Sequence, residues 1–343
     1  MSALTPDELE SNCEELHITV SESDRVDFKR LDQYLVEKLK DFSRTFIKGI
    51  FEEGLITAVS AKGEAEKIEL KKMPPVGTML EIEIPPLPPS EAVAENIPLD
   101  ILYEDDDILF VNKPAGMVTH PAPGHYTGTL VNALLFHFNQ VREMQIESGS
   151  QRPGIVHRLD MGTSGVMVVA KNSKAHEKLV LMFSKHDIER LYEALVMKSD
   201  NMLQAGMLEG AIGRHPKNRL KMSVNPRGRW AKTYYKMIKD FGKCCLMELK
   251  LETGRTHQIR VHLSTLLKAA ILNDKLYGNP NEHQGRLGSE IKELIKDYPY
   301  PFLHARVLGL NHPITGKFLR FEVPAPELFE KVKLALNNQH EKK

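Results

Sequence analysis

One short stretch of the chain, IVHRLDMGTSGVMVVAK at residues 155–171, gathers an imidazole, a guanidinium and a carboxylate within four positions. Gly162 and Gly165 follow, and glycine permits the sharp backbone path needed before the apolar run VMVVA begins a strand. Asp160 is therefore expected on a loop between two strands, where its carboxylate can face a cleft and act as an acid, base or nucleophile. Taken alone, an aspartate beside Arg158 is more often a turn residue or half of a surface ion pair than a catalyst.

A second polar cluster, LETGRTHQIRVHL, occupies residues 251–263. Its pattern predicts a strand that ends at Gly254, an N-cap at Thr256 and a helix whose first turn carries Arg260. A guanidinium in the first turn of a helix is unfavourable beside the positive end of the helix dipole. Arg260 therefore calls for a partner, and a facing carboxylate would serve.

The sequence shows no metal site or cofactor site of a recognised kind. His257 and His262 are five residues apart and would point to different faces of the helix, and no HExxH motif is present. Cys13, Cys244 and Cys245 give neither CxxC spacing nor an even disulfide framework. Phosphate loops of the Rossmann or Walker type are also absent. We therefore expect chemistry without a cofactor or a metal, in a reducing compartment.

The elements that must position these residues belong to a chain of globular composition. Of 343 residues, 41% are hydrophobic and 27% are charged, which is enough for a sizeable core. Lys plus Arg and Asp plus Glu number 46 each, so net charge gives no hint of a polyanionic partner. Neither a secretory leader pattern nor a run of 18 apolar residues occurs, so we expect a cytoplasmic protein that does not bind membranes.

The first quarter of the chain predicts an acidic arm and then a small domain. Residues 1–27 hold eight acids and a single arginine, with little apolar periodicity, so we expect an arm without regular structure. The leucine spacing in RLDQYLVEKL predicts a helix, Ser43 is a candidate N-cap for a second helix, and Gly54 is placed to end it. LITAV and TMLEIEI predict short strands. These elements indicate a small α/β domain at residues 28–85.

The rest of the chain predicts a tether and a larger domain. PPLPPSEA has four prolines in five residues and predicts a linker at 86–98, followed by a domain at 99–335 and an unstructured tail at 336–343. Predicted strands lie at 108–112, 154–158, 165–171, 188–197, 219–224, 231–240 and 244–252. Predicted helices lie at 129–138, 173–184 and 257–267. Many strands with few helices between them indicate an α+β fold with a mixed, mainly antiparallel sheet flanked by helices and loops.

A basic stretch stands out against the neutral total. Residues 212–239 hold nine Lys or Arg and no acid. Screening confines each charge field to about 8–10 Å at physiological salt, so a local cluster can bind nucleic acid although net charge is zero. A solvated basic hairpin is the alternative. The residues we single out as candidate RNA contacts are Arg214, Lys217, Arg219 and Lys221.

The small domain resembles the S4 RNA-binding module. Its order is helix, serine-arginine, helix, glycine, strand, with RLD at 30–32 and SR at 43–44 in the usual places. Where that family has a valine-asparagine-glycine turn, this chain reads TAVSAKG. The resemblance implies RNA contacts from Arg30, Ser43 and Arg44. The alternative is an accessory α+β domain that does not touch RNA.

Five ordered motifs in the larger domain resemble the RluA-like family of pseudouridine synthases. They are KPAGMVTHPAPGH at 113–125, RPGIVHRLDMGTSGVMVVAK at 152–171, RLYEALV at 190–196, LETGRTHQIRVHL at 251–263 and HARVLGLNHPITG at 304–316. The chain departs from the family pattern at Met161-Gly162, where a charged pair is usual, and at Asn273, where a glycine is usual before the aspartate. Neither departure touches a residue that the resemblance implies in catalysis.

The resemblance implies isomerisation of uridine in RNA, and it assigns roles residue by residue. Asp160 would be the catalytic carboxylate, either as a nucleophile at C1′ or as a base that abstracts a ribose proton. Arg260 would pair with Asp160, and an opposite charge within about 4–6 Å keeps a carboxylate ionised. Tyr192 would stack on the uracil, and Arg158 would enter the helical stack as the base leaves it.

The family further implies the partner. An S4-like module joined to this catalytic domain implies structured RNA of the large ribosomal subunit, 23S-type ribosomal RNA or its precursor, as the substrate. We expect a monomer that needs no small-molecule cofactor. His157, Thr163 and Ser164 are expected to hold the structure of the loop.

Two other functions remain open at this point. A non-catalytic RNA-binding factor for ribosome assembly would keep the fold without the reaction, and an Asp160→Asn variant would distinguish the two. A hydrolytic glycosidase would need a second carboxylate, which the acids from Asp105 to Asp107 could supply only if they fold against the cleft.

Overall fold

The computed structural model describes residues 14–40, 42, 44–84, 92–122, 124–138, 154–199 and 202–341. The chain forms two compact units, residues 1–90 and 91–343, and each is described by itself. No helix within the described ranges combines the length and the apolar character needed to cross a membrane.

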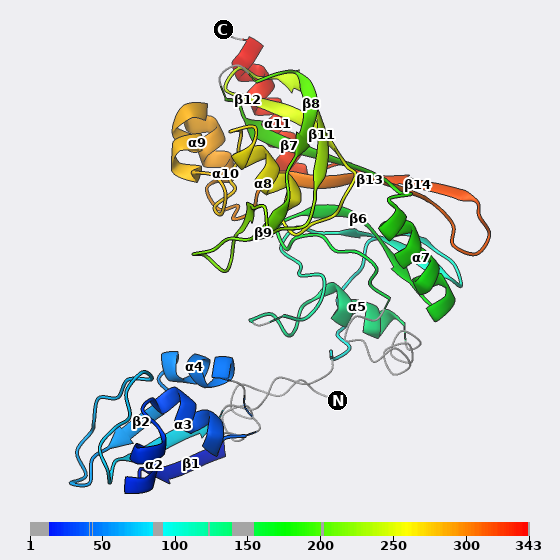
Figure 1. The fold of residues 1–343 in the computed structure, drawn as a ribbon. Helices are drawn as coiled ribbons and strands as arrows, with labels where there is room; N and C mark the ends of the chain where they lie inside the picture. Colours follow the sequence, from blue (N-terminus) through cyan, green and yellow to red (C-terminus); the bar gives the residue numbers. More distant parts are fainter. Residues whose placement is uncertain are drawn as a thin grey trace. The chain divides into compact units, whose positions relative to one another are not determined.

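The first unit is built on a three-stranded antiparallel sheet with the strand order β1-β3-β2 (Figure 1). Its elements are β1 (Glu14–Thr19), α2 (Glu22–Asp27), α3 (Leu31–Lys38), α4 (Arg44–Glu52), β2 (Ile56–Val59) and β3 (Met79–Ile84). Leu31 and Leu35, two of the leucines that predicted the first helix, are fully buried in the core that this sheet shares with its helices. Gly54 follows α4 with a φ of 82°, which a glycine adopts without strain.

The expectation of an arm without regular structure is wrong for residues 14–27. β1 pairs with β3 along its whole length. Ser21 caps α2, because its Oγ accepts the backbone N–H of Asp24 while the Asp24 carboxylate accepts the backbone N–H of Ser21. Leu16 and Ile18 alternate with polar residues and pack on the core. A short period-2 pattern was therefore present behind the acid-rich composition.

The second unit contains a nine-stranded sheet and a separate two-stranded ribbon. The large sheet has the order β4-β5-β6-β13-β7-β12-β11-β8, with β14 paired to β13. β6 and β13 pair in parallel and the other pairs are antiparallel, which confirms the predicted mixed, mainly antiparallel sheet. The strands are β4 (Ile101–Glu104), β5 (Ile108–Lys113), β6 (Ser164–Ala170), β7 (Glu189–Met197), β8 (Ala205–Glu209), β9 (Ile212–Arg214), β10 (Met222–Val224), β11 (Lys232–Asp240), β12 (Cys244–Leu251), β13 (Leu303–Asn311) and β14 (Phe318–Glu322). The helices are α5 (Leu130–His137), α7 (Ser173–Lys185), α8 (Gln258–Thr265), α9 (Pro280–Leu287), α10 (Ser289–Ile295) and α11 (Glu327–Glu341).

Three segments differ from their prediction. Residues 154–158 are not a strand and make a single bridge, Ile155 with Val169. Residues 92–98, expected in the linker, are tied to α5, because Asn132 Nδ2 donates to the Val93 carbonyl at 2.7 Å. The predicted tail at 336–343 is helical as far as Glu341, since α11 buries an apolar stripe that ends at Leu336.

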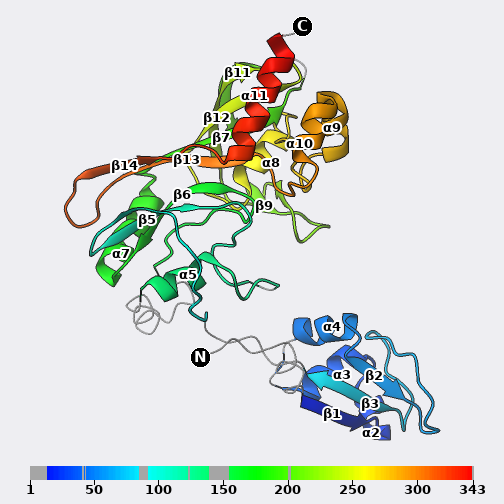
Figure 2. The same cartoon turned by 180° about the vertical axis from the view of Figure 1, so that it is seen from behind.

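The large sheet is covered on both faces. Figures 1 and 2 show α8 on one side of β7 and β12 and α11 on the other. Val196 of β7 belongs to the core that includes Ile259 and Leu263 of α8, whereas the preceding Leu195 packs with Phe329 of α11. Successive residues of a strand point to opposite faces, so β7 supplies both cores.

Gly165 determines how closely β6 approaches β13. It has a φ of 122°, and a Cβ atom there would lie 2.1 Å from the Ala305 carbonyl oxygen. A side chain at this position would prevent the parallel pairing of Gly165 with Ala305. The glycine thereby fixes the backbone just downstream of the loop that carries Asp160.

Candidate active site

A cavity of about 370 Å³ in the second unit collects the residues that the motifs predicted. Asp160 comes from the loop before β6, Tyr192 from β7 and Arg260 from the first turn of α8, and all three line this cavity. Arg158 lines it as well. The tertiary structure therefore brings together four residues that lie on three separate segments of the chain.

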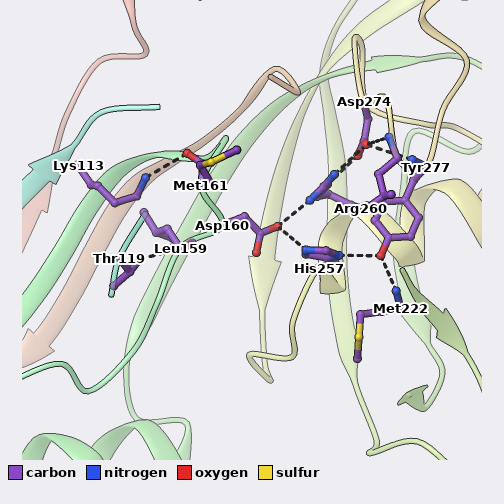
Figure 3. Close-up of polar contacts among 11 residues, drawn as sticks. Lys113, Thr119, Leu159, Asp160, Met161, Met222, His257, Arg260, Asp274 and Tyr277 are labelled. Atoms are coloured by element: carbon purple, nitrogen blue, oxygen red, sulfur yellow. Dashed lines mark hydrogen bonds and ion pairs between the residues drawn. The ribbon is translucent and has the colours of Figure 1, made fainter. Parts of the chain in front are cut away.

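Asp160 and Arg260 form an ion pair inside the cavity (Figure 3). Arg260 Nη1 donates to Asp160 Oδ2 at 3.1 Å, and 18% of the Asp160 side chain remains exposed. The facing carboxylate that the helix start called for is thus present. Asp160 keeps its second oxygen, Oδ1, free of hydrogen bonds within the described residues, so it is available to a ligand.

Arg260 is held in place by a second carboxylate, Asp274. Arg260 Nε and Nη2 donate to the two oxygens of Asp274 at 2.7 and 2.9 Å, and the Asp274 side chain is 1% exposed. Asp274 also accepts the backbone N–H groups of Leu276 and Tyr277. Burial disfavours the guanidinium charge, but the hydrogen bonds and charge of Asp274, and then those of Asp160, outweigh it and raise the pKa of Arg260.

His257 and Tyr277 flank the pair, as Figure 3 shows. Met222 N–H donates to Tyr277 Oη at 2.7 Å, and Tyr277 Oη lies 2.7 Å from His257 Nδ1. His257 Nε2 lies 3.9 Å from Asp160 Oδ2. Burial lowers the pKa of His257 although the charge of Asp160 opposes this, and burial raises the pKa of Tyr277 to about 12. Both groups are therefore neutral near pH 7.

The predicted N-cap at Thr256 is wrong. His257 occupies the cap position with a φ of 56°, in the left-handed region that non-glycine residues rarely adopt. Its side chain makes no capping hydrogen bond and instead reaches Tyr277. His262 points elsewhere, to Thr233 and the Gly210 carbonyl, which agrees with the expectation that the two histidines share no site.

The loop that carries Asp160 is fixed from behind by two buried side chains (Figure 3). Thr119 Oγ1 donates to the Leu159 carbonyl at 3.0 Å. Lys113 Nζ donates to the carbonyls of Pro114 and Met117 and lies 3.4 Å from the Met161 carbonyl. Burial lowers the pKa of Lys113 to about 7, although the charge of Asp160 opposes this shift.

The residues expected to hold the loop structure do so in two cases. His157 Nε2 accepts the Val168 N–H at 3.0 Å, and its ring stacks on Phe183. Ser164 Oγ lies 2.9 Å from His304 Nδ1 across the parallel strand pair. For Thr163, the structure shows a backbone contact, in which its N–H donates to the Asp160 carbonyl.

Tyr192 and Arg158 differ in their surroundings. The Tyr192 ring is 9% exposed, its hydroxyl makes no hydrogen bond within the described residues, and burial raises its pKa. Arg158 is exposed, and its Nη1 lies 3.5 Å from His120 Nε2.

The remaining predicted RNA contacts lie outside this cavity. In the first unit, Arg30 and Arg44 both bind the carboxylate of Asp32, with closest distances of 2.9 and 2.6 Å. Ser43 lies outside the described residues. In the second unit the predicted contacts flank the β9–β10 ribbon: Arg214, Lys217 and Arg219 are exposed and Lys221 is half-buried. None of the described residues among these predicted contacts lines the cavity that holds Asp160.

The acids that would have suited a glycosidase do not line the cavity. Asp105 Oδ1 accepts the backbone N–H groups of Asp107 and Ile108, and its Oδ2 accepts hydrogen bonds from Tyr103 and His312. Asp105, Asp107 and His312 bring three ligand atoms within 4.8 Å of one another. The hydrogen bonds of Asp105 hold the turn between β4 and β5, which explains why these three residues lie together.

Sequence reasoning missed Asp274, His257 and Tyr277 as members of the site. Asp274 stands in AAILNDKLYG, where a lone acid follows an apolar run. An acid in such a position is a candidate buried partner for a cation, and this was the available signal. Nothing in the sequence pattern indicated that His257 and Tyr277 would meet.

The chain resembles known proteins along most of its length. Residues 107–265 match the family model described as RNA pseudouridylate synthase. The chain is 40% identical over 309 residues to "Ribosomal large subunit pseudouridine synthase D" of Vibrio cholerae, covering 90% of this chain and 91% of the relative. It is 39% identical over 316 residues to "Uncharacterized RNA pseudouridine synthase YlyB" of Bacillus subtilis, covering 91% and 95% of the two.

A solved structure agrees as well. "Human RNA Pseudouridylate Synthase Domain Containing 4" superposes with a TM-score of 0.52 and 25% identity, covering 69% of this chain and 92% of that one. The identity of 39–40% to the two sequence relatives, along nine tenths of this chain, shows the family. The chain belongs to the RluA-like family of RNA pseudouridine synthases.

Proposed function

We propose that this protein converts uridine to pseudouridine in structured RNA of the large ribosomal subunit, with Asp160 as its catalytic carboxylate. The observation that carries the proposal is the Asp160–Arg260 ion pair, which lines one cavity together with Tyr192. The RNA target rests on relatives whose names specify a ribosomal large subunit pseudouridine synthase.

The reaction is an isomerisation in which atoms balance without a co-reactant. The N1–C1′ bond of uridine breaks, the uracil turns over, and C5 bonds to C1′. C5 then loses its proton and N1 gains one. Asp160 either attacks C1′ or abstracts a ribose proton to give a glycal, and its free Oδ1 suits both routes.

Arg260 orients Asp160 while the base is exchanged. An ionised carboxylate in a partly buried site needs an opposite charge nearby. Because Asp274 fixes the other edge of the guanidinium, Arg260 presents Nη1 to Asp160 in one orientation. Asp274 therefore positions Asp160 through Arg260, and in this proposal Asp274 does not itself react.

Tyr192 stacks on the uracil after the base has left the RNA. Base stacking on an aromatic ring contributes about 1–3 kcal/mol, and extraction of a base from a helix costs a few kcal/mol. Arg158, exposed beside the cavity, fills the space that the base vacates. Loops and bulges are favoured targets because their bases are already partly unstacked.

The basic residues away from the cavity hold the RNA. In this proposal Arg214, Lys217, Arg219 and Lys221 contact phosphates, and the first unit acts as an S4-like module through Arg30, Ser43 and Arg44. Asp32 supports that role because it orients both guanidiniums while more than a third of each side chain stays exposed. We further propose that the protein acts as a monomer, since one chain supplies every residue assigned here. We also propose that it acts in the cytoplasm and without a cofactor.

The test maps pseudouridines in ribosomal RNA by carbodiimide adducts in a deletion strain and in strains that carry the wild-type or the Asp160→Asn gene. We expect at least one large-subunit pseudouridine to disappear on deletion and to return only with the wild type. Full rescue of a growth defect by Asp160→Asn would instead favour an assembly factor. Persistence of every pseudouridine, in a strain without a redundant enzyme, would contradict the proposal.

A further inference from the structure

The active-site cavity carries more positive charge than the catalytic pair requires. Five arginines line it and Asp160 is the one carboxylate among its lining residues. Asp160 and the adjacent Asp274 balance Arg260. Arg158 has a role in the proposed reaction. The arginines left over are Arg190, Arg229 and Arg255.

Arg190 is a buried charge without a counter-charge. It is 7% exposed, and no carboxylate of the described residues pairs with it. Its Nη2 donates to the carbonyls of Leu251 and Glu252 at 3.5 and 3.1 Å, while Nε has no partner in the described part of the chain. Burial lowers the pKa of Arg190, but a guanidinium stays protonated at any pH the protein meets. An unpaired buried charge is costly unless a ligand compensates it.

Space has been left beside this guanidinium. A Cβ atom on Gly254 would lie 3.1 Å from Arg190 Nη1. Gly254 lines the cavity and is exposed, so the missing side chain keeps the Nη1 edge of Arg190 open to it. Arg190 and Tyr192 are two residues apart on β7 and share a face, about 6–7 Å from one another along the strand.

Arg255 and Arg229 continue the positive charge outward. Arg255 is half-buried, and its Nε donates to the Trp230 carbonyl at 3.2 Å. Burial, and then the charge of Arg229, lowers the pKa of Arg255. Arg229 and Arg255 both line the cavity. The Arg229 side chain is exposed and makes no hydrogen bond or ion pair with the described residues. Positive side chains that line one cavity are suited to bind an anion.

We propose that Arg190, Arg255 and Arg229 form a phosphate-binding site for the RNA backbone next to the uridine that stacks on Tyr192. Guanidinium groups match phosphate oxygens in paired hydrogen bonds, and the three side chains increase in exposure from the interior to the surface. In this proposal the sugar–phosphate chain of a base held at Tyr192 runs beside these residues, because all three line the cavity that Tyr192 lines. This inference rests on the proposed RNA substrate and adds the residues that grip its backbone.

The test measures how the affinity of the full chain for a large-subunit ribosomal RNA transcript depends on salt. Arg190→Gln, Arg229→Gln and Arg255→Gln are compared with wild type between 50 and 300 mM KCl. Each lost phosphate contact reduces the slope of log K against log salt by about 1. We expect this reduction for each variant, with a rise in KM at nearly unchanged kcat, since phosphate contacts hold ground state and transition state equally.

Two controls separate phosphate binding from a structural role. Arg286→Gln removes an exposed arginine that also donates to a backbone carbonyl but does not line the cavity, and its slope should match wild type. Arg190→Lys keeps a charge and should recover most of the slope while it loses part of the affinity. Because Arg229 and Arg255 are not buried, their variants report on the site even if Arg190→Gln does not fold.

Unchanged slopes for all three glutamine variants would overturn the inference and leave Arg190 as a support for the end of β12. A wild-type protein that binds the transcript with a normal slope and yields no pseudouridine would instead overturn the proposed function. The two failures are therefore distinguishable in one set of measurements.

Discussion

Arg260 and Asp160 are 100 residues apart in the sequence, and Arg260 Nη1 lies 3.1 Å from Asp160 Oδ2 in the folded chain. The same guanidinium binds Asp274, which is 1% exposed at its side chain against 18% for Asp160. The Arg260 guanidinium thus binds both Asp160, which a substrate can reach, and Asp274, which is buried. A substitution at Asp160 and one at Asp274 should therefore have different effects.

Asp160→Asn should abolish isomerisation and leave the fold and RNA affinity intact. An amide is isosteric with the carboxylate but neither attacks C1′ nor accepts a proton, so we expect kcat to fall at least about 10³-fold. Pseudouridine formed in a ribosomal RNA transcript measures the effect. Asp187→Asn, at an exposed aspartate outside the cavity, is the control. Measurable turnover by Asp160→Asn near the wild-type rate would remove Asp160 from the chemistry.

Asp274→Ala should destabilise the protein much more than Asp160→Ala. Loss of Asp274 leaves a buried guanidinium without its two-point partner, which costs about 3–5 kcal/mol. Loss of Asp160 removes a partly exposed partner and leaves Arg260 bound to Asp274, so we expect less than about 1 kcal/mol. Urea unfolding of both variants measures the difference. Equal destabilisation would show that Asp274 does not anchor Arg260.

Tyr192→Phe should retain most activity and Tyr192→Ala should not. The ring supplies the stacking surface, whereas the hydroxyl makes no hydrogen bond with the described residues. We expect Tyr192→Ala to lower kcat/KM by a factor that corresponds to about 1–3 kcal/mol. Steady-state kinetics on the same transcript would show it. Equal losses in the two variants would mean that the hydroxyl takes part in the reaction.

Because of His157, the free energy of unfolding should decrease as the pH falls below about 6.5. Burial, assisted by the charge of Arg190, lowers the pKa of His157 to about 3, so the folded state binds fewer protons than the unfolded state between these values. Stability is therefore complete above the unfolded pKa and decreases towards pH 3, by up to about 1.4 kcal/mol per pH unit.

His157→Gln keeps an acceptor for the Val168 N–H and does not titrate. The difference in the free energy of unfolding between wild type and this variant should therefore become smaller from pH 7 to pH 5. Denaturant unfolding at several pH values measures this. Parallel curves for His157→Gln would show that His157 is not held neutral by the fold.

The local elements were predictable, and so was the set of motif residues that meet in one cavity, because their signals are local. The leucine spacing at Leu31 and Leu35 and the turn chemistry at Gly54 act over a few residues, and the strands of the larger domain follow from short apolar runs. The structure of residues 14–27 was not predicted, because their high charge conceals a short alternating pattern. The end of α11 was not predicted, because its apolar stripe is recognised only once the helix packs on the sheet. The strand predicted at 154–158 is wrong, because a strand needs a partner in register and only Ile155 makes a bridge.

The sequence by itself singled out the residues that we propose for the chemistry: Asp160, Tyr192 and Arg260 stand in ordered motifs that can be read in one dimension. Only the tertiary structure decided that Asp274 shares Arg260 and that Arg190 is buried with no counter-charge among the described residues. The physical reason is that hydrogen-bond partners and burial depend on segments that pack together from distant parts of the chain. Local propensity carries no information about which of those segments meet.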